Sequence, residues 1–142
     1  MKADPARVFD AFTDAGDLLS WLADGAVVGR RAGGNWGLGW YAGEESDEGY
    51  QIFGTFEVYE PGSRLVVRDL RFTTPEGESW GGMRLSVDLA AEDEGTRVTV
   101  VQDGVGEGAS WNGYAAGLGP GWERSLADLR AWIEEGRKLP GR

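Results

Sequence analysis

The sequence contains no cysteine and no histidine among its 142 residues. Without cysteine, the fold cannot depend on disulfides, and the chain offers neither a thiolate nucleophile nor a thiolate metal site. Without histidine, the chain lacks the usual general base near neutral pH, the serine–histidine catalytic pair and the common zinc ligands. We therefore expect no catalytic residue, no metal site and no cofactor.

Basic residues and long apolar runs are also scarce. The chain has 14 Lys and Arg residues against 24 Asp and Glu residues, and its net charge of -10 opposes binding to phosphate backbones and anionic membranes. No stretch approaches the roughly 18 consecutive apolar residues of a membrane helix, and no charged start followed by an apolar run indicates a signal peptide. The sequence predicts a cytoplasmic protein with no nucleic-acid and no membrane partner.

The chain does contain enough apolar material for a packed core. Apolar residues make up 41% of the sequence, and seven of them are tryptophan. A chain of 142 residues fits one domain and leaves little room for a second. We expect a single domain over residues 1–142.

The longest regular pattern lies between residues 111 and 136. Apolar side chains recur there at steps of three or four, which places them along one face of a helix: Trp111, Tyr114, Leu118, Trp122, Leu126, Leu129 and Ile133. Gly136 can adopt the left-handed conformation that ends helices, and Pro140 prevents the helix from resuming. A helix this long must lie along a sheet, with Leu129 as a buried anchor.

Three glycines, Gly113, Gly117 and Gly121, recur every four residues beside this apolar face. Glycine costs about 1 kcal/mol relative to alanine inside a helix, and Pro120 removes one backbone hydrogen bond. Two interpretations follow. Either the helix begins only at Pro120, or the missing side chains leave volume between helix and sheet where a ligand could sit.

The rest of the chain predicts two short helices followed by antiparallel strands. Residues 5–13 predict a helix with Asp4 as its N-cap, and residues 18–22 predict a second short helix. Alternating apolar residues then predict strands, including a hairpin that turns at Gly33 and Gly34. Sequential strands joined by short turns favour an antiparallel meander. We therefore predict an α+β helix-grip fold, in which a curved sheet wraps the last helix.

Several short motifs are spread over nearly the whole chain: residues 3–9, 31–36, 54–61 and 95–99, then Gly121, Trp122, Leu126 and Leu129. Each motif is weak alone, but their order and spacing make the combination fairly specific. Together they resemble the bacterial START-type (SRPBCC) proteins of the group related to the activator of heat-shock protein 90 ATPase. The resemblance implies a cavity between sheet and long helix that holds small hydrophobic molecules, and a link to the stress response. It does not imply one chemistry, because relatives include carriers, cyclases and co-chaperone domains.

The chain departs from this family at its start. Family members usually begin with a strand before the alanine, aspartate and proline, whereas only Met1 and Lys2 stand there, so we expect the first strand to be largely missing. In the family's sheet that strand lies beside the final one, which should leave residues 97–103 as an exposed edge. An edge with valines and no proline is prone to pair with another chain. This predicts a homodimer through the edge strand, with a hydrated edge on a monomer as the alternative.

The inward-facing strand positions and the long helix predict a mostly apolar pocket with a few polar contacts. The candidate ligand-binding residues are Trp36, Trp40, Phe56, Asp69, Arg71, Met83, Gln102, Tyr114 and Leu118. A β-bulge of one residue would reverse the direction of any strand position among them. The alternative interpretation is that the aromatic residues form the core, while Asp69 and Arg71 lie in water at a strand end.

The primary hypothesis is noncatalytic binding of a small hydrophobic molecule. The alternatives are a polyketide-type cyclase or hydrolase that uses a pocket carboxylate, and a co-chaperone-like module that binds protein through its surface. A carrier predicts an apolar cavity, and an enzyme predicts a buried carboxylate beside the cavity. A protein-binding module predicts a filled interior with an exposed apolar patch.

Overall fold

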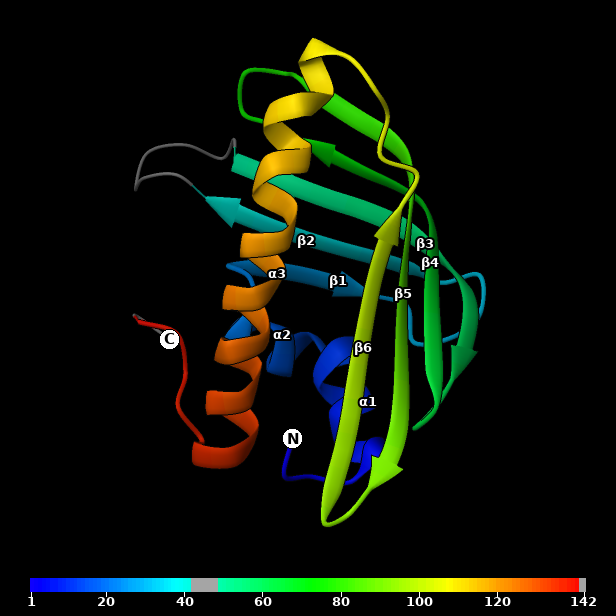
Figure 1. The fold of residues 1–142 in the computed structure, drawn as a ribbon, viewed down its shortest axis with the longest axis vertical. Coiled ribbons are helices and arrows are strands. Elements are labelled where there is room, and N and C mark those ends of the chain that lie inside the picture. The colour runs from blue at the N-terminus through cyan, green and yellow to red at the C-terminus, as the bar shows by residue number, and fades with distance from the viewer. Residues whose placement is uncertain (42–48, 141–142) are drawn as a thin grey trace.

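The computed structural model describes residues 1–41 and 49–140 and contains the predicted elements in the predicted order (Figure 1). The elements are α1 (Pro5–Thr13), α2 (Ala15–Trp21), β1 (Gly25–Val28), β2 (Asn35–Tyr41), β3 (Gly49–Glu60), β4 (Arg64–Thr73), β5 (Ser79–Glu92), β6 (Gly95–Asp103) and α3 (Ala109–Glu135). Each strand pairs antiparallel with the next, so the sheet has the order β1-β2-β3-β4-β5-β6. The α+β helix-grip prediction is confirmed.

The sheet is strongly curved, and the long helix lies along its open side. Figure 1 shows β1, β2 and β3 passing behind α3, while β4, β5 and β6 run beside it on the right. The two short helices α1 and α2 fill the lower end of the fold between the sheet and the second half of α3. The core therefore lies at one end of the molecule, and its largest fully buried side chains include Phe9, Phe12, Leu18, Trp21, Phe56, Leu65, Leu85 and Leu129.

Asp17 connects all three helices. Asp14 begins α2 as its N-cap by accepting a hydrogen bond from the Asp17 backbone N–H at 2.9 Å. The Asp17 carboxylate forms two hydrogen bonds with the Arg7 guanidinium of α1, both of 2.9 Å, and this pairing raises the pKa of Arg7. The Trp132 indole N–H of α3 donates to the same carboxylate at 2.9 Å. One side chain thus fixes how the second half of α3 sits on the short helices.

Helix α3 runs without interruption through Pro120, so the interpretation that the helix begins only at Pro120 is wrong. Its first turn is anchored from the sheet, because the Trp80 indole N–H donates to the Ser110 carbonyl at 2.7 Å. Its end is where the sequence predicted it. Gly136 adopts the left-handed conformation at φ 66°, and its N–H donates to the Trp132 carbonyl at 3.0 Å.

Strand β6 forms one edge of the sheet. At its start, Met1 and Thr96 exchange two backbone hydrogen bonds of 3.0 and 2.9 Å. Within the described residues, no further backbone pairing follows along the outer side of β6 toward Asp103. The expectation of a largely missing first strand and an open edge over residues 97–103 agrees with this arrangement.

The core analysis predicts that Leu129→Ala lowers the free energy of unfolding by roughly 2 to 5 kcal/mol, because a fully buried leucine leaves a cavity when it is truncated. Urea denaturation of the two proteins measures this loss. Leu118→Ala is the matched control on the same face of α3, and it should cost less because Leu118 already borders empty volume. A loss of under about 0.5 kcal/mol at Leu129, the size of a surface effect, would contradict its role as anchor.

Candidate functional site

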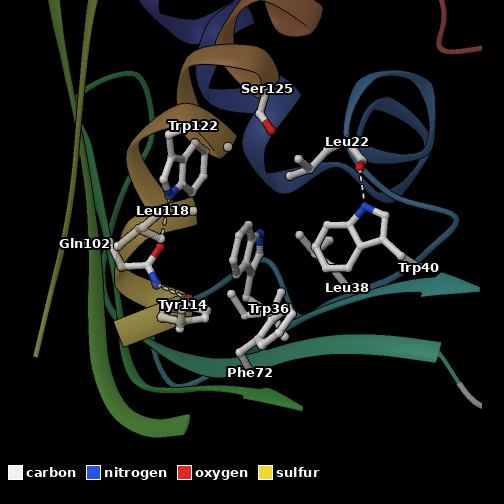
Figure 2. Close-up of a pocket in the computed structure, with 14 residues that line it drawn as sticks. Leu22, Trp36, Leu38, Trp40, Phe72, Gln102, Tyr114, Leu118, Trp122 and Ser125 are labelled. Carbon is white, nitrogen blue, oxygen red and sulfur yellow. Dashed lines mark hydrogen bonds between the residues drawn. The ribbon is translucent and has the colours of Figure 1, made fainter. Parts of the chain in front are cut away.

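A cavity of about 370 Å³ separates the first half of α3 from the concave face of the sheet. Figure 2 shows side chains from α3, from the strands and from the end of α2 converging on this space. Its lining consists of Leu22, Trp36, Leu38, Trp40, Ile52, Phe72, Gln102, Gly113, Tyr114, Gly117, Leu118, Gly121, Trp122 and Ser125. The volume falls within the usual range for sites that bind small molecules, about 300 to 1,000 Å³.

The glycine row creates much of this space. Gly113, Gly117 and Gly121 all belong to the lining, as expected for residues spaced one turn apart on the sheet-facing side of α3. A Cβ atom placed on any of the three would meet nothing within 4 Å. The neighbouring structure therefore leaves room for side chains that the sequence does not supply. This agrees with the interpretation that the missing side chains leave volume between helix and sheet.

Two tryptophans of β2 form the wall opposite α3. Trp36 and Trp40 point inward together with Leu38, because alternate strand residues face the same side of a sheet. Their indole N–H groups are already used: Trp36 donates to the Phe12 carbonyl at 3.0 Å, and Trp40 donates to the Leu22 carbonyl at 2.7 Å. The two indoles thus add apolar ring surface to the cavity, while their polar atoms serve the protein's own backbone.

An aromatic cluster closes the end of the cavity near the start of α3. The Tyr114 ring stacks on Trp80 with centroids 5.6 Å apart, lies 5.3 Å from Phe72 and meets Trp111 edge to face at 6.1 Å. Such contacts add roughly 0.5 to 1.5 kcal/mol per pair beyond the burial of the rings. Tyr114 is therefore held by rings of β4, β5 and α3 and has little freedom to turn away.

A short chain of hydrogen bonds forms the polar part of the wall. The Trp122 indole N–H donates to Gln102 Oε1 at 2.9 Å, and Gln102 Nε2 donates to the Tyr114 hydroxyl oxygen at 2.7 Å. The same nitrogen lies 3.3 Å from Met83 Sδ. Burial raises the pKa of Tyr114, and the hydrogen bond from Gln102 partly offsets this shift by lowering it. The tyrosine is consequently neutral at physiological pH.

Five of the nine predicted ligand-binding residues line the cavity: Trp36, Trp40, Gln102, Tyr114 and Leu118. Phe56 and Met83 also point inward, but both are fully buried in the core and do not border the space. Phe56 packs edge to face on Tyr59, which in turn contacts Phe9 of α1, so it lies under the short helices. Whether the five lining residues contact a ligand stays a prediction.

The expectation that Asp69 and Arg71 face the cavity is wrong. Strand β4 contains one extra residue relative to β5 between Val67 and Leu70, and Asp69 lies within this bulge at φ 52°. Leu70 is fully buried, whereas the Asp69 side chain is 80% exposed. Arg71 is also exposed and donates to Ser79 Oγ at 2.8 Å. The alternative that these two charges lie in water is the correct one.

The sequence hypothesis omitted several apolar lining residues. Leu38 lies between two tryptophans that were selected, so the alternation of β2 could have identified it. Phe72 was missed because the bulge of β4 changes which residues face inward. Leu22 follows α2 and reaches the cavity only through the packing of that helix on the sheet. No pattern in the sequence indicates that contact.

The described lining contains no Asp, Glu, Lys or Arg side chain. Residues 1–41 and 49–140 also contain no cluster of three or more acidic, His or Cys residues that could hold a metal ion. The polar side chains of the lining are therefore neutral ones, from Gln102, Tyr114, Trp122 and Ser125.

Within residues 1–41 and 49–140, no helix is both long and apolar enough to cross a membrane.

Solved structures of several proteins share this fold. DynU16, a protein in the dynemicin biosynthetic locus, matches over 97% of this chain with 19% identity and a TM-score of 0.72, although the match spans only 46% of the DynU16 chain. The AHSA1-like protein from Aeromonas hydrophila matches 95% of this chain and 88% of its own, with 21% identity and a TM-score of 0.69. The Aha1 dimer from Colwellia psychrerythraea matches 96% and 92%, with 17% identity and a TM-score of 0.71. At such low sequence identity, these three matches show that the fold is shared and show nothing about function.

A match to a family model shows which protein family the chain belongs to, which a shared fold alone does not. The comparison with curated proteins finds no match. Residues 2–134, however, match the model described as activator of Hsp90 ATPase homolog 1-like protein. The match covers nearly all of the chain and agrees with the resemblance found in the sequence. The chain belongs to the family of activator of Hsp90 ATPase homolog 1-like proteins.

Proposed function

We propose that the protein binds a small hydrophobic molecule, without catalysis, in the cavity between α3 and the sheet. The observation that carries this proposal is the cavity itself, which is about 370 Å³ in volume and is lined by aromatic and aliphatic side chains and by the glycine row. Burial of apolar ligand surface yields roughly 25 cal/mol per Å², so such a lining favours an apolar ligand. The match to DynU16, from a biosynthetic locus, is compatible with a small organic ligand.

The two alternative functions find less support in this site. A cyclase or hydrolase that uses a pocket carboxylate would need Asp or Glu beside the cavity, and the described lining contains neither. A co-chaperone-like module predicts a filled interior and an exposed apolar patch. Val27 and Phe53 do form an exposed apolar surface on the outer face of the sheet, with 69% and 49% exposure, but the interior beneath α3 is not filled. The cavity thus favours binding of a small molecule.

Two further expectations accompany this proposal. We treat residues 1–142 as a single START-like domain, because the described chain forms one continuous sheet with three helices packed on it. A cytoplasmic location and a role in the stress response stay predictions from composition and from the family.

The glycine row provides the test of the proposed function. In Gly117→Leu, the new side chain should occupy the cavity and weaken binding of the neutral probe N-phenyl-1-naphthylamine by at least about tenfold. Probe fluorescence titration measures the dissociation constant. Gly119→Leu is the matched control, because Gly119 lies on the same helix in equally open space but does not line the cavity. Equal probe affinity in both folded variants would show that the probe binds elsewhere.

We also propose that two copies of the chain associate through the outer edge of β6. Thr96 directs its backbone N–H and C=O outward to Met1, so the alternate residues Val98, Val100 and Gln102 direct theirs outward as well. Unpaired groups on an exposed edge favour pairing with another strand. The structural neighbour from Colwellia psychrerythraea is described as a dimer, which supports the same expectation for this chain.

One register of two β6 strands would pair the outward backbone N–H and C=O groups and would also place opposite charges across from each other. If two antiparallel β6 strands meet with Val100 opposite its own copy, Val98 lies opposite Gln102 of the second copy, and these opposed pairs consist of residues with outward backbone groups. The same register places Arg97 opposite Asp103 of the second copy on the exposed side, twice in the symmetric dimer. Opposite charges at directly opposed positions stabilise a strand pair, and like charges destabilise it.

This register predicts that Asp103→Lys weakens the dimer by about tenfold, because the introduced lysine would face Arg97 of the second copy in both symmetric positions. Sedimentation velocity over a micromolar concentration series measures the dissociation constant. The double variant Arg97→Glu with Asp103→Lys restores opposite charges and should recover the dimer. A native chain that stays monomeric throughout the series would refute the proposal, and a double variant as weak as the single one would refute the register.

A further inference from the structure

The hydrogen bonds from Trp122 through Gln102 to Tyr114 run in a single direction. An indole nitrogen can only donate, so the 2.9 Å contact from Trp122 Nε1 fixes the accepting atom of the Gln102 amide as its oxygen. The amide nitrogen then faces the Tyr114 hydroxyl at 2.7 Å and donates to it. The hydroxyl oxygen is an acceptor in this bond. Its own proton is therefore left to point at a different partner.

Neither amide hydrogen of Gln102 is left for a ligand. One is donated to Tyr114, and the other has Met83 Sδ as its acceptor at 3.3 Å. The indole N–H groups of Trp36, Trp40 and Trp122 are engaged as well. By contrast, residues 1–41 and 49–140 provide no hydrogen-bond acceptor for the Tyr114 proton. The described lining contains two hydroxyls, those of Tyr114 and Ser125, and only the Tyr114 oxygen is held in place by an accepted hydrogen bond, which leaves its proton uncommitted.

The position and protonation of this hydroxyl are both well defined. Stacking on Trp80 and contact with Phe72 hold the ring, while Gln102 holds the oxygen. Burial raises the pKa of Tyr114, so the proton is present at neutral pH. A donor fixed in this way loses little conformational freedom when a ligand binds, which favours its use in recognition.

We propose that Tyr114 donates a hydrogen bond to the bound ligand, and that the ligand is a neutral aromatic or polycyclic molecule carrying a hydrogen-bond acceptor such as a ketone carbonyl. We infer a neutral ligand because the described lining contains no charged side chain. We infer an aromatic ligand because Trp36 and Trp40 present ring surfaces to the cavity. This inference rests on the proposed function, because it names the chemical class of ligand for the same cavity.

Fluorenone and fluorene provide a matched pair of probes, because they share one tricyclic skeleton and differ by a carbonyl in place of a methylene. Equilibrium dialysis against the intact protein at pH 8 gives both dissociation constants. The wild-type protein should bind fluorenone about threefold to tenfold more tightly than fluorene, the value of one neutral hydrogen bond. In Tyr114→Phe, this preference should disappear while fluorene affinity stays within about twofold, which also shows that the cavity is intact. Tyr41→Phe removes a hydroxyl on the outer face and should keep the preference.

Gln102→Glu tests whether the amide positions the tyrosine proton. At pH 8 the new carboxylate can accept from both Trp122 and Tyr114, so the tyrosine proton would turn toward it and away from the ligand. The preference for fluorenone should then disappear even though Tyr114 is present. The infrared carbonyl stretch of bound fluorenone should lie at lower frequency in the wild-type protein than in either Tyr114→Phe or Gln102→Glu, since only the wild-type carbonyl is hydrogen-bonded.

The outcomes separate this inference from the function on which it rests. If the wild-type protein binds neither probe, the proposed function fails and the inference fails with it. If it binds both probes equally, or if Tyr114→Phe retains the preference, the cavity still binds apolar molecules and the inference alone is overturned. Retention of the preference in Gln102→Glu would contradict the directing role of the amide.

Discussion

Helix α3 is held against the sheet at its two ends and is bridged in the middle by one side chain. At its second half, Leu129 is fully buried and Trp132 donates to Asp17. At its first turn, the Ser110 carbonyl accepts from Trp80 of β5. Between these anchors, Gln102 of β6 accepts from one residue of the helix and donates to another. This arrangement lets the helix span the curved sheet without filling the space beneath it.

The cavity follows from that constraint and from the residues that face it. Side chains at positions 113, 117 and 121 would take up part of this volume, but glycine at all three leaves it open. The tryptophan N–H groups that would otherwise make the space polar are directed to backbone carbonyls or to Gln102. The result is a largely apolar cavity in which the Tyr114 hydroxyl is held by Gln102, and these two features are the basis of the proposed ligand binding.

Much of the fold could be predicted because local rules and tertiary packing agree. Asp4 before Pro5 predicted the start of α1, and the apolar periodicity with Gly136 predicted the end of α3. The site was less accessible to sequence reasoning. The bulge at Asp69 reverses the facing of β4, and alternation could not reveal it because Val66, Val67 and Leu70 are all apolar and all buried. Strand alternation correctly predicted that Gln102 faces inward. Its hydrogen bonds with Trp122 and Tyr114 could not be predicted, because they depend on how α3 lies across β6.

The indole N–H resonances of the seven tryptophans offer the most direct test of the central claim that an apolar molecule binds beneath α3. Titration of fluorenone into ¹⁵N-labelled protein should shift the indole signals of Trp36, Trp40 and Trp122, which line the cavity, with one common saturation curve. The signals of Trp21, in the core, and of Trp132, bound to Asp17, should stay in place. Saturable shifts confined to Trp21 and Trp132, or no saturable shift in any indole, would contradict the account.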